Sequence, residues 1–320
     1  MEKIMTVTGP IEPEKLGMTL THEHIFCDQS REMGQGRNPL LNDIELAYEE
    51  LMLYKNAGGR TLIDQTTKGL RGGVKDGATR EILNELHPIA IRNMAKRTGL
   101  NIILGTGWYR QPYYPEYINQ IKTNELTDEF IRDINIGIDG TDVRAGILGE
   151  IGANTTWISP AEERVFRAVA RAHIQTGVTI ATHTSGMTIG LDQLDLLEEE
   201  GVSLHRVIIG HCHSYNNHEY HLEMARRGAY LQFDRMGQME GYEPNTWLGL
   251  IVKLINAGYE NKILLSHDVC ARNNLVGYGG NGYAYIATKL EPILNDLGVS
   301  KKQFKQLTIE NPKRALTGEK

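Results

Sequence analysis

Two histidines near the start of the chain, His22 and His24, are spaced so that they could act together. Residues 17–26 read as a β-strand, in which residues i and i+2 point to the same face. His22 and His24 would then share a face, with Glu23 pointing away. Two adjacent imidazoles can serve as a pair of metal ligands. The alternative is two unrelated polar residues, so the question is whether the chain supplies further ligands.

Further ligand candidates follow short apolar segments at regular intervals. Glu150, His183 and His211 each end such a segment, and they lie about one strand and one helix apart. Asp268 follows a later segment, about two such units beyond His211. A chance scatter of histidines and acids would not recur in register with the secondary structure. The spacing therefore favours one shared site over separate buried polar residues.

The elements that must position these residues form a regular series of eight apolar segments and intervening helices. The strands lack polar alternation, as is typical of parallel strands buried on both faces. The strands are expected at 17–26, 61–66, 101–107, 145–150, 178–183, 207–211, 229–233 and 262–267. Helices are expected near 43–57, 78–98, 125–137, 160–176, 188–200, 217–227, 244–257, 284–297 and 301–310.

Eight such units predict an α/β protein with a closed (β/α)8 TIM barrel, as a single domain over residues 1–320. The alternative is an open doubly wound sheet, which would more often show a glycine-rich phosphate loop after its first strand; none is present. In a barrel the active site lies at the carboxyl ends of the strands. The ligand candidates occupy those ends.

The combined set predicts a metal centre. Its members are His22, His24, Glu150, His183, His211 and Asp268. One ion needs three or four such ligands, so six indicate two divalent metal ions bridged by Glu150. Nitrogen and oxygen ligands suit Zn²⁺, with Mn²⁺, Co²⁺ and Fe²⁺ as alternatives. Two close ions can ionise a shared water to a bridging hydroxide, and Asp268 could accept the proton, which describes hydrolysis of an ester-like bond.

Composition narrows the classes of partner. The chain has 320 residues, 40% of them hydrophobic, and a net charge of −6, which argues against nucleic acid or an anionic membrane as partner. The three cysteines form no CxxC pair, so a disulfide framework is not expected. No apolar segment approaches the roughly 20 residues that span a bilayer, and no secretory signal is recognisable. We therefore expect a cytoplasmic protein.

Several stretches resemble the phosphotriesterase family of the amidohydrolase superfamily, from about Val7 to Leu316. They are GMTLTHEH (17–24), LGEIG (148–152), ATHTS (181–185), IIGHC (208–212), QFD (232–234), SHD (266–268), GGNGY (279–283) and ENP (310–312). The resemblance implies a (β/α)8 barrel with a binuclear metal centre, often zinc, and often a homodimer. In the organophosphate-degrading members a carboxylated lysine bridges the metals. Here Glu150 holds that position, and no lysine occurs from 123 to 252. The chain thus resembles the branch of phosphotriesterase homology and phosphotriesterase-related proteins.

Two further positions bear on the substrate. Efficient phosphotriesterases carry a histidine after strand seven, where this chain has Arg235. Arginine cannot take a proton at neutral pH, but it can donate a fork of hydrogen bonds to a carbonyl, carboxylate or phosphate. Lactonases of the family often have arginine here, and Tyr109 matches a tyrosine that they place near the metals. The expected catalytic residues are therefore Asp268, Tyr109 and Arg235, acting on a small-molecule lactone or carboxylic ester, with weak phosphotriesterase activity compatible.

Substrate-binding candidates lie in the loops. They are Arg272, Tyr278 and Trp108. Arg272 could bind an anionic group, such as the phosphate of a phosphorylated sugar lactone, or instead pair with loop carbonyls or acids. Trp108 could line the pocket or only pack. Two other functions stay open: an amidase acting on N-acyl amino acids or similar amides, and a metal-bearing binding protein without turnover.

Overall fold

Eight parallel strands form the centre of the molecule in this computed structural model, which describes residues 3–32, 38–72, 74–75, 82–83, 85–184, 188–238 and 244–319. Each strand pairs with the next one of the sheet along the chain. The strands are β3 (Thr19–Glu23), β6 (Thr61–Asp64), β9 (Asn101–Thr106), β10 (Ile147–Gly152), β11 (Ile180–His183), β12 (Val207–Ile209), β13 (Tyr230–Phe233) and β14 (Ile263–Leu265).

The first and last of these strands meet at a seam. No ladder is assigned between β3 and β14 in the described part of the chain, yet hydrogen bonds join these strands and the residues that directly follow them. The Asp268 amide donates to the His22 carbonyl at 3.0 Å, and the His24 amide donates to the Val269 carbonyl at 3.2 Å. The Thr21 hydroxyl donates to the Leu265 carbonyl at 3.3 Å. These bonds close the sheet, so the predicted (β/α)8 barrel is confirmed.

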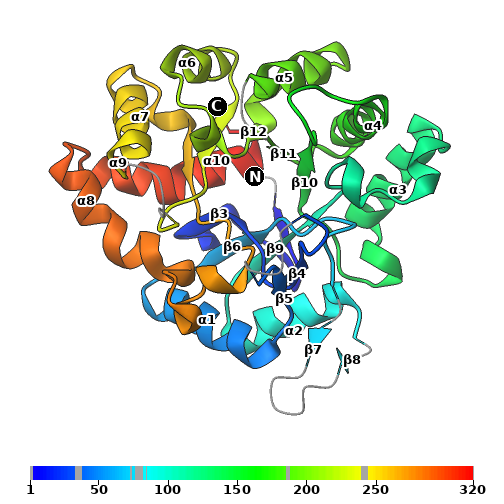
Figure 1. Cartoon of the computed structure of the whole chain (residues 1–320), viewed down its shortest axis with the longest axis horizontal. Coiled ribbons are helices and arrows are strands. Elements are labelled where there is room, and N and C mark those ends of the chain that lie inside the picture. Colours follow the sequence, from blue (N-terminus) through cyan, green and yellow to red (C-terminus); the bar gives the residue numbers. More distant parts are fainter. Residues whose placement is uncertain are drawn as a thin grey trace.

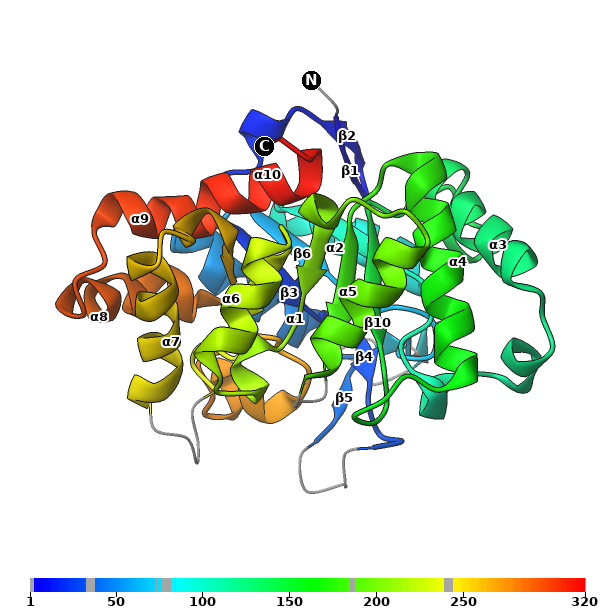
Figure 2. The same ribbon diagram turned by 90° about the horizontal axis from the view of Figure 1, so that it is seen from above.

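Helices surround the strands (Figure 1). They are α1 (Ile44–Asn56), α2 (His87–Thr98), α3 (Thr123–Asn135), α4 (Pro160–Thr176), α5 (Ile189–Glu199), α6 (His218–Arg226), α7 (Pro244–Asn256), α8 (Glu291–Asp296), α9 (Lys301–Lys305) and α10 (Asn311–Thr317). In side view, the hairpin of β1 (Ile4–Thr6) and β2 (Gly9–Ile11) lies with α10 at one end of the barrel (Figure 2). The hairpin of β4 (Cys27–Asp28) and β5 (Leu40–Leu41) lies at the other end, where β3 terminates.

A layer of apolar side chains fills the amino end of the barrel. Seven strands contribute one buried residue each: Ile63, Ile103, Ile147, Ala181, Ile208, Tyr230 and Leu264. Ile4 from β1, with Ala315 and Leu316 from α10, packs onto this layer. A larger cluster occupies the space between the strands and the helices. The barrel is therefore solid at this end, as in other barrels of its kind, and side chains can enclose a polar site only at the other end.

Local chemistry explains where α4 begins and ends. The Ser159 hydroxyl accepts from the Glu162 amide, and the Glu162 carboxylate accepts from the Ser159 amide, which forms a capping box. Pro160 occupies the first turn, where its missing N–H costs nothing. Gly177 ends the helix in the left-handed region, at φ 73°.

Three helix predictions needed correction. The helix expected from 78 begins only at His87: residues 82–83 form β8, which pairs with β7 (Val74–Lys75), and residues 76–81 lie outside the described part. The expected helices at 284–297 and 301–310 each contain a π-helical turn, at Ile286–Leu290 and Gln306–Glu310. Pro292 and Pro312 follow these turns, and a wider turn accommodates a proline that cannot donate to the preceding turn. Helix α10 was not expected.

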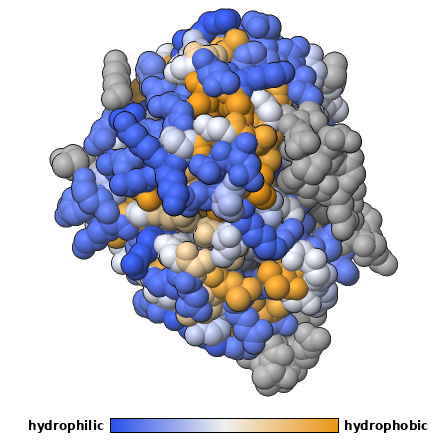
Figure 3. Space-filling view, turned by 90° about the vertical axis from the view of Figure 1, so that its left-hand side faces the viewer, coloured by the Kyte–Doolittle hydropathy of each residue, from blue (hydrophilic) through white to orange (hydrophobic). Residues whose placement is uncertain are grey.

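The surface over α7, α8 and α9 is mainly hydrophilic, with hydrophobic patches between the polar side chains (Figure 3). Ile293 and Leu297, in and after α8, are 38% and 40% exposed. Among the described residues, no helix has both the length and the apolar character needed to cross a membrane.

Candidate metal centre

The six predicted ligands come together at the carboxyl end of the barrel, and none is more than 9% exposed. Glu150 lies at their centre. Its Oε1 is 3.3 Å from His24 Nε2, and its Oε2 is 3.4 Å from His22 Nε2. The same Oε2 is 2.8 Å from His183 Nδ1 and 3.6 Å from His211 Nε2. One carboxylate thus lies within 3.6 Å of four imidazoles, three of them at Oε2 and one at Oε1, so it could serve as a shared ligand.

Asp268 closes the cluster from the strand β14 side. Its Oδ1 lies 3.3 Å from His24 Nε2 and 3.8 Å from His22 Nε2, and its Oδ2 lies 4.0 Å from His211 Nδ1. Among the six predicted ligands, three overlapping triads have ligand atoms within 4.8 Å of one another, and a fourth group, His211–His213–Asp234, adjoins them. The triads are His22–His24–Glu150, Glu150–His183–His211 and His22–His211–Asp268.

The backbone is irregular at three of these residues, Glu150, His211 and Asp268. Ile147 faces the barrel interior, so strict alternation would point Glu150 outward. The pairing of β10 with β11 shifts register between Leu148 and Ile151, and this irregularity brings Glu150 inside. His211 and Asp268 adopt the left-handed region, at φ 55° and 50°. Such conformations are uncommon for residues other than glycine and cluster at functional sites.

The histidines fit a metal ion. The Nε2 atoms of His22 and His24 are buried and have no hydrogen-bond partner among the described residues. Their other ring nitrogens are engaged: His22 Nδ1 lies 2.8 Å from Asp234 Oδ2, and His24 Nδ1 lies 2.9 Å from Thr66 Oγ1. A proton on each Nδ1 leaves the Nε2 lone pair free, and outer hydrogen bonds of this kind orient ligating histidines. Each Nε2 also lies 3.3–3.4 Å from an oxygen of Glu150, so a cation between them could bind both.

Asp234 was missed as a member of the site, although QFD had been noted as a family stretch. Its Oδ1 lies 2.9 Å from His211 Nδ1 and 3.2 Å from His213 Nδ1, in addition to the contact of its Oδ2 with His22. Burial opposes ionisation, but the neighbouring histidines, His211 foremost, hold the pKa of Asp234 well below its usual range. Asp234 directly follows β13, so the strand-end rule that found the ligands could also have found it.

Glu23 was correctly expected to point away from His22 and His24, but its role was missed. Its Oε1 accepts from the Ser266 hydroxyl at 2.7 Å, from the His267 amide at 2.8 Å and from His267 Nδ1 at 2.8 Å. Its Oε2 accepts from the Val269 amide at 2.9 Å. Glu23 therefore joins β3 to the segment that carries Asp268.

Charges inside the centre strongly shift its titration. Burial disfavours a charged imidazole, yet Asp268 and Glu150 outweigh it and raise the pKa of His24 to about 9. Asp234 does the same for His211, whose pKa rises to about 9. Burial and the charge of His211 instead lower the pKa of His183 to about 3. Burial would raise the pKa of Asp268, but neighbouring cations, Arg235 foremost, lower it to about 2.

Two of the expected catalytic residues border the cluster. The Tyr109 hydroxyl lies 3.3 Å from His183 Nδ1, and the two rings are 5.0 Å apart. Arg235 Nη2 lies 2.8 Å from Asp268 Oδ2, and its Nη1 donates to Gln238 Oε1 at 2.7 Å. Arg235 thus contacts the Asp268 carboxylate directly, on the side away from His24.

Arg272 and Tyr278 lie in the loop after β14. Arg272 Nε donates to the Leu40 carbonyl at 2.9 Å, and its Nη2 donates to Asn42 Oδ1 at 3.2 Å. Its Nη1 lies 3.5 Å from the hydroxyl of Tyr278, whose side chain is 49% exposed. The guanidinium therefore binds a loop carbonyl, the second of the two roles considered for it, and substrate binding by either residue stays a prediction.

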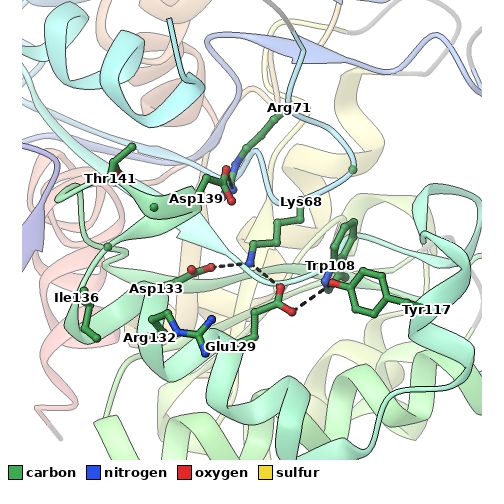
Figure 4. Close-up of a pocket in the computed structure, with 13 residues that line it drawn as sticks. Lys68, Arg71, Trp108, Tyr117, Glu129, Arg132, Asp133, Ile136, Asp139 and Thr141 are labelled. Atoms are coloured by element: carbon green, nitrogen blue, oxygen red, sulfur yellow. Dashed lines mark hydrogen bonds and ion pairs between the residues drawn. The ribbon is translucent and has the colours of Figure 1, made fainter.

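Trp108 lines a separate cavity of about 550 Å³, formed by the segments that follow β6 and β9, by α3 and by the residues after α3 (Figure 4). None of the six ligand candidates lines this cavity. Lys68 Nζ lies there between Glu129 Oε1, at 2.5 Å, and Asp133 Oδ2, at 3.0 Å. The charged side chains in the middle of this cavity therefore pair with one another. Substrate binding by Trp108 stays a prediction.

Known proteins resemble the chain along nearly its whole length. The model of the phosphotriesterase family matches residues 2–316. The phosphotriesterase homology protein of Escherichia coli (strain K12) is 35% identical over 296 residues, 92% of this chain and 96% of that protein. The N-acetyltaurine hydrolase of Danio rerio is 30% identical over 357 residues, with 98% of each chain covered. The crystal structure of a lactonase from Listeria monocytogenes has a TM-score of 0.89 at 28% identity and covers 100% of both chains.

Proposed function

The chain belongs to the phosphotriesterase family, and on this premise we propose that it is a binuclear zinc hydrolase of lactones and carboxylic esters. The observation that carries the proposal is the position of Glu150, whose carboxylate lies within 3.6 Å of four imidazoles. His22, His24 and Asp268 would hold one ion, His183 and His211 the other, and Glu150 both. When bound, two such ions activate water and polarise the bond under attack.

The residues around the centre divide the remaining work. Asp268 is held as a carboxylate by Arg235, so it can accept the proton of the attacking water and pass it to the leaving oxygen. The low pKa of Asp268 favours the transfer of the proton from its carboxyl group to the leaving oxygen. Tyr109 has its hydroxyl on the His183 side, where it can donate a hydrogen bond to the substrate carbonyl oxygen as negative charge develops there.

The relatives support two substrate classes. A lactonase with a TM-score of 0.89 and the presence of Arg235 favour lactones. Phosphorylated sugar lactones are one class of lactone that we propose to test. The N-acetyltaurine hydrolase at 30% identity favours a second candidate, an amidase acting on N-acyl amino acids and similar amides. An amide needs its leaving nitrogen protonated, which Asp268 could also do. Zinc as the native metal, a homodimer and a cytoplasmic location stay predictions.

A turnover screen of the zinc-loaded protein separates these candidates. The panel holds sugar lactones with and without phosphate, aryl esters, N-acyl amino acids with N-acetyltaurine, and phosphotriesters. We expect the highest kcat/KM on a lactone or ester, lost with a chelator and restored with Zn²⁺. A preference for amides would replace the proposal with the amidase, and no turnover of any compound would favour a binding protein.

The Asp268→Asn variant tests the proton transfer. Asparagine keeps an oxygen ligand but cannot take up a proton at neutral pH, so kcat should fall by about 10²–10⁴. Zinc content, measured by atomic absorption, should stay near that of the wild type. Full activity in this variant would refute the role of Asp268 as proton carrier.

A further inference from the structure

Arg110 lies close to the metal centre, although the sequence pattern did not single it out. It follows Tyr109 in the segment between β9 and α3, and its guanidinium carbon is 4.9 Å from the centroid of the Tyr109 ring. That ring is in turn 5.0 Å from the ring of His183. One aromatic ring thus separates this cation from the ligand cluster.

The guanidinium of Arg110 has a hydrogen-bond donor without a partner among the described residues. Its Nη2 donates to Glu32 Oε2, in the loop that follows β4. Its Nε is buried and has no hydrogen-bond partner among the described residues. A guanidinium presents its donors as a planar fork that suits a carboxylate, sulfonate or phosphate. The spare donor leaves Arg110 able to hold an oxyanion in two-point contact.

The ion pair between Arg110 and Glu32 can exchange. The two side chains are 16% and 22% exposed, so solvent reaches the pair. Another oxyanion could take the place of Glu32 without leaving the guanidinium unpaired. Two other arginines near the centre have partners of another kind: Arg235 pairs with the ligand candidate Asp268, and Arg272 donates to the Leu40 carbonyl.

We propose that Arg110 binds an oxyanion carried by the substrate, and that Glu32 occupies this position until the substrate displaces it. The inference rests on the proposed hydrolase function and narrows its substrates to esters, lactones or amides that bear a negative charge. The charged group would lie on the Tyr109 side of the scissile bond. Neutral substrates would lack this contact and would bind more weakly.

A matched pair of esters tests the proposal in the zinc-loaded protein. One is 4-nitrophenyl hydrogen glutarate, which carries a carboxylate, and the other is its neutral methyl ester. The readout is the ratio of kcat/KM for the anionic ester to that for the neutral ester. Losing one charge-assisted, two-point contact should lower this ratio about tenfold or more in Arg110→Gln. Arg110→Lys keeps the positive charge but lacks the planar fork of donors. Its ratio should lie between that of the wild type and that of Arg110→Gln.

Two further variants complete the design. Glu32→Gln removes the competing carboxylate, so KM for the anionic ester should fall below that of the wild type. Arg97→Gln breaks an exposed ion pair with Glu45 on α1 and α2 and serves as the matched control. A fall in the ratio of less than threefold in Arg110→Gln, or an unchanged or raised KM in Glu32→Gln, would overturn the proposal.

Binding of the product acid separates this inference from the proposed function. Calorimetric titration of the zinc-loaded protein compares glutarate with monomethyl glutarate, which lacks the second charge. Arg110→Gln should lose the preference of the wild type for glutarate. If the wild type hydrolyses neither ester, the proposed esterase function fails. The binding preference for glutarate over monomethyl glutarate then still tests whether Arg110 binds an anion. A wild type without any preference would overturn the anion site.

Discussion

Glu23→Gln is the sharpest test of how the barrel seam positions the site. Glutamine offers one acceptor oxygen where the carboxylate offers two. If the amide oxygen takes the place of Oε1, it keeps the bonds from Ser266 and His267, but its NH₂ group then faces the Val269 amide. The reverse orientation leaves three donors unpaired instead of one. His267 cannot compensate by changing tautomer, because its Nε2 accepts from the Ile286 amide at 3.1 Å.

The magnitude follows from these four hydrogen bonds. One buried amide without an acceptor costs about 1–3 kcal/mol. The three remaining bonds change from charge-assisted to neutral, which costs roughly 0.5–1 kcal/mol each because charge-assisted bonds are about twice as strong. Removing a buried charge recovers part of its desolvation cost. We therefore expect the free energy of unfolding to fall by about 3 kcal/mol.

Urea unfolding of the zinc-loaded protein, followed by circular dichroism, measures this change. The midpoint should fall while the slope stays the same, since the same surface is exposed on unfolding. Glu219→Gln is the control: it removes an exposed carboxylate on α6, 3.9 Å from Arg226, and should change stability by no more than about 0.5 kcal/mol. A loss below about 1 kcal/mol in Glu23→Gln would show that these bonds do not hold the seam.

Two predictions concern the metal ligands. Asp234→Asn removes the carboxylate that orients His22 and His211, so zinc affinity should fall about 10–100-fold in competition with a chromophoric chelator; an unchanged affinity would contradict the orienting role. The pKa values of His24 and His211 are raised to about 9, so both rings are protonated at pH 7 without metal, whereas a ligating ring must be neutral. Zinc affinity should therefore rise from pH 7 to pH 9, with release of protons on binding. An affinity that is already constant above pH 7, as for histidines of ordinary pKa, would show that the pKa values of His24 and His211 are not raised.

Helix limits show where local pattern succeeds and fails. The start of α4 was predictable because Ser159, Pro160 and Glu162 form their cap within four consecutive residues. The start of α2 was not, since residues 82–83 pair as a strand instead of continuing an apolar helical pattern. The π-helical turns before Pro292 and Pro312 depend on how the chain packs around a proline that local propensity alone would treat as a break.

The sequence by itself predicted the barrel and brought the ligand candidates to one end of it. Strand and helix periodicity is a local property, and in a barrel every strand end reaches the same face, so Glu150, His183 and His211 could be assigned to one site from their spacing. The same reasoning assigned His22 and His24, since neighbours two apart on a strand share a side.

Only the tertiary structure decided what holds these ligands and what lies beside them. Glu23 meets Ser266 across 243 positions of the chain, and His22 meets Asp234 across 212. Such contacts depend on strand register, on the irregularity that turns Glu150 inward, and on which loops fold over the barrel mouth, as with Arg110 and Glu32. A one-residue shift in register reverses the face of every side chain that follows, and nothing in the local sequence reports such a shift.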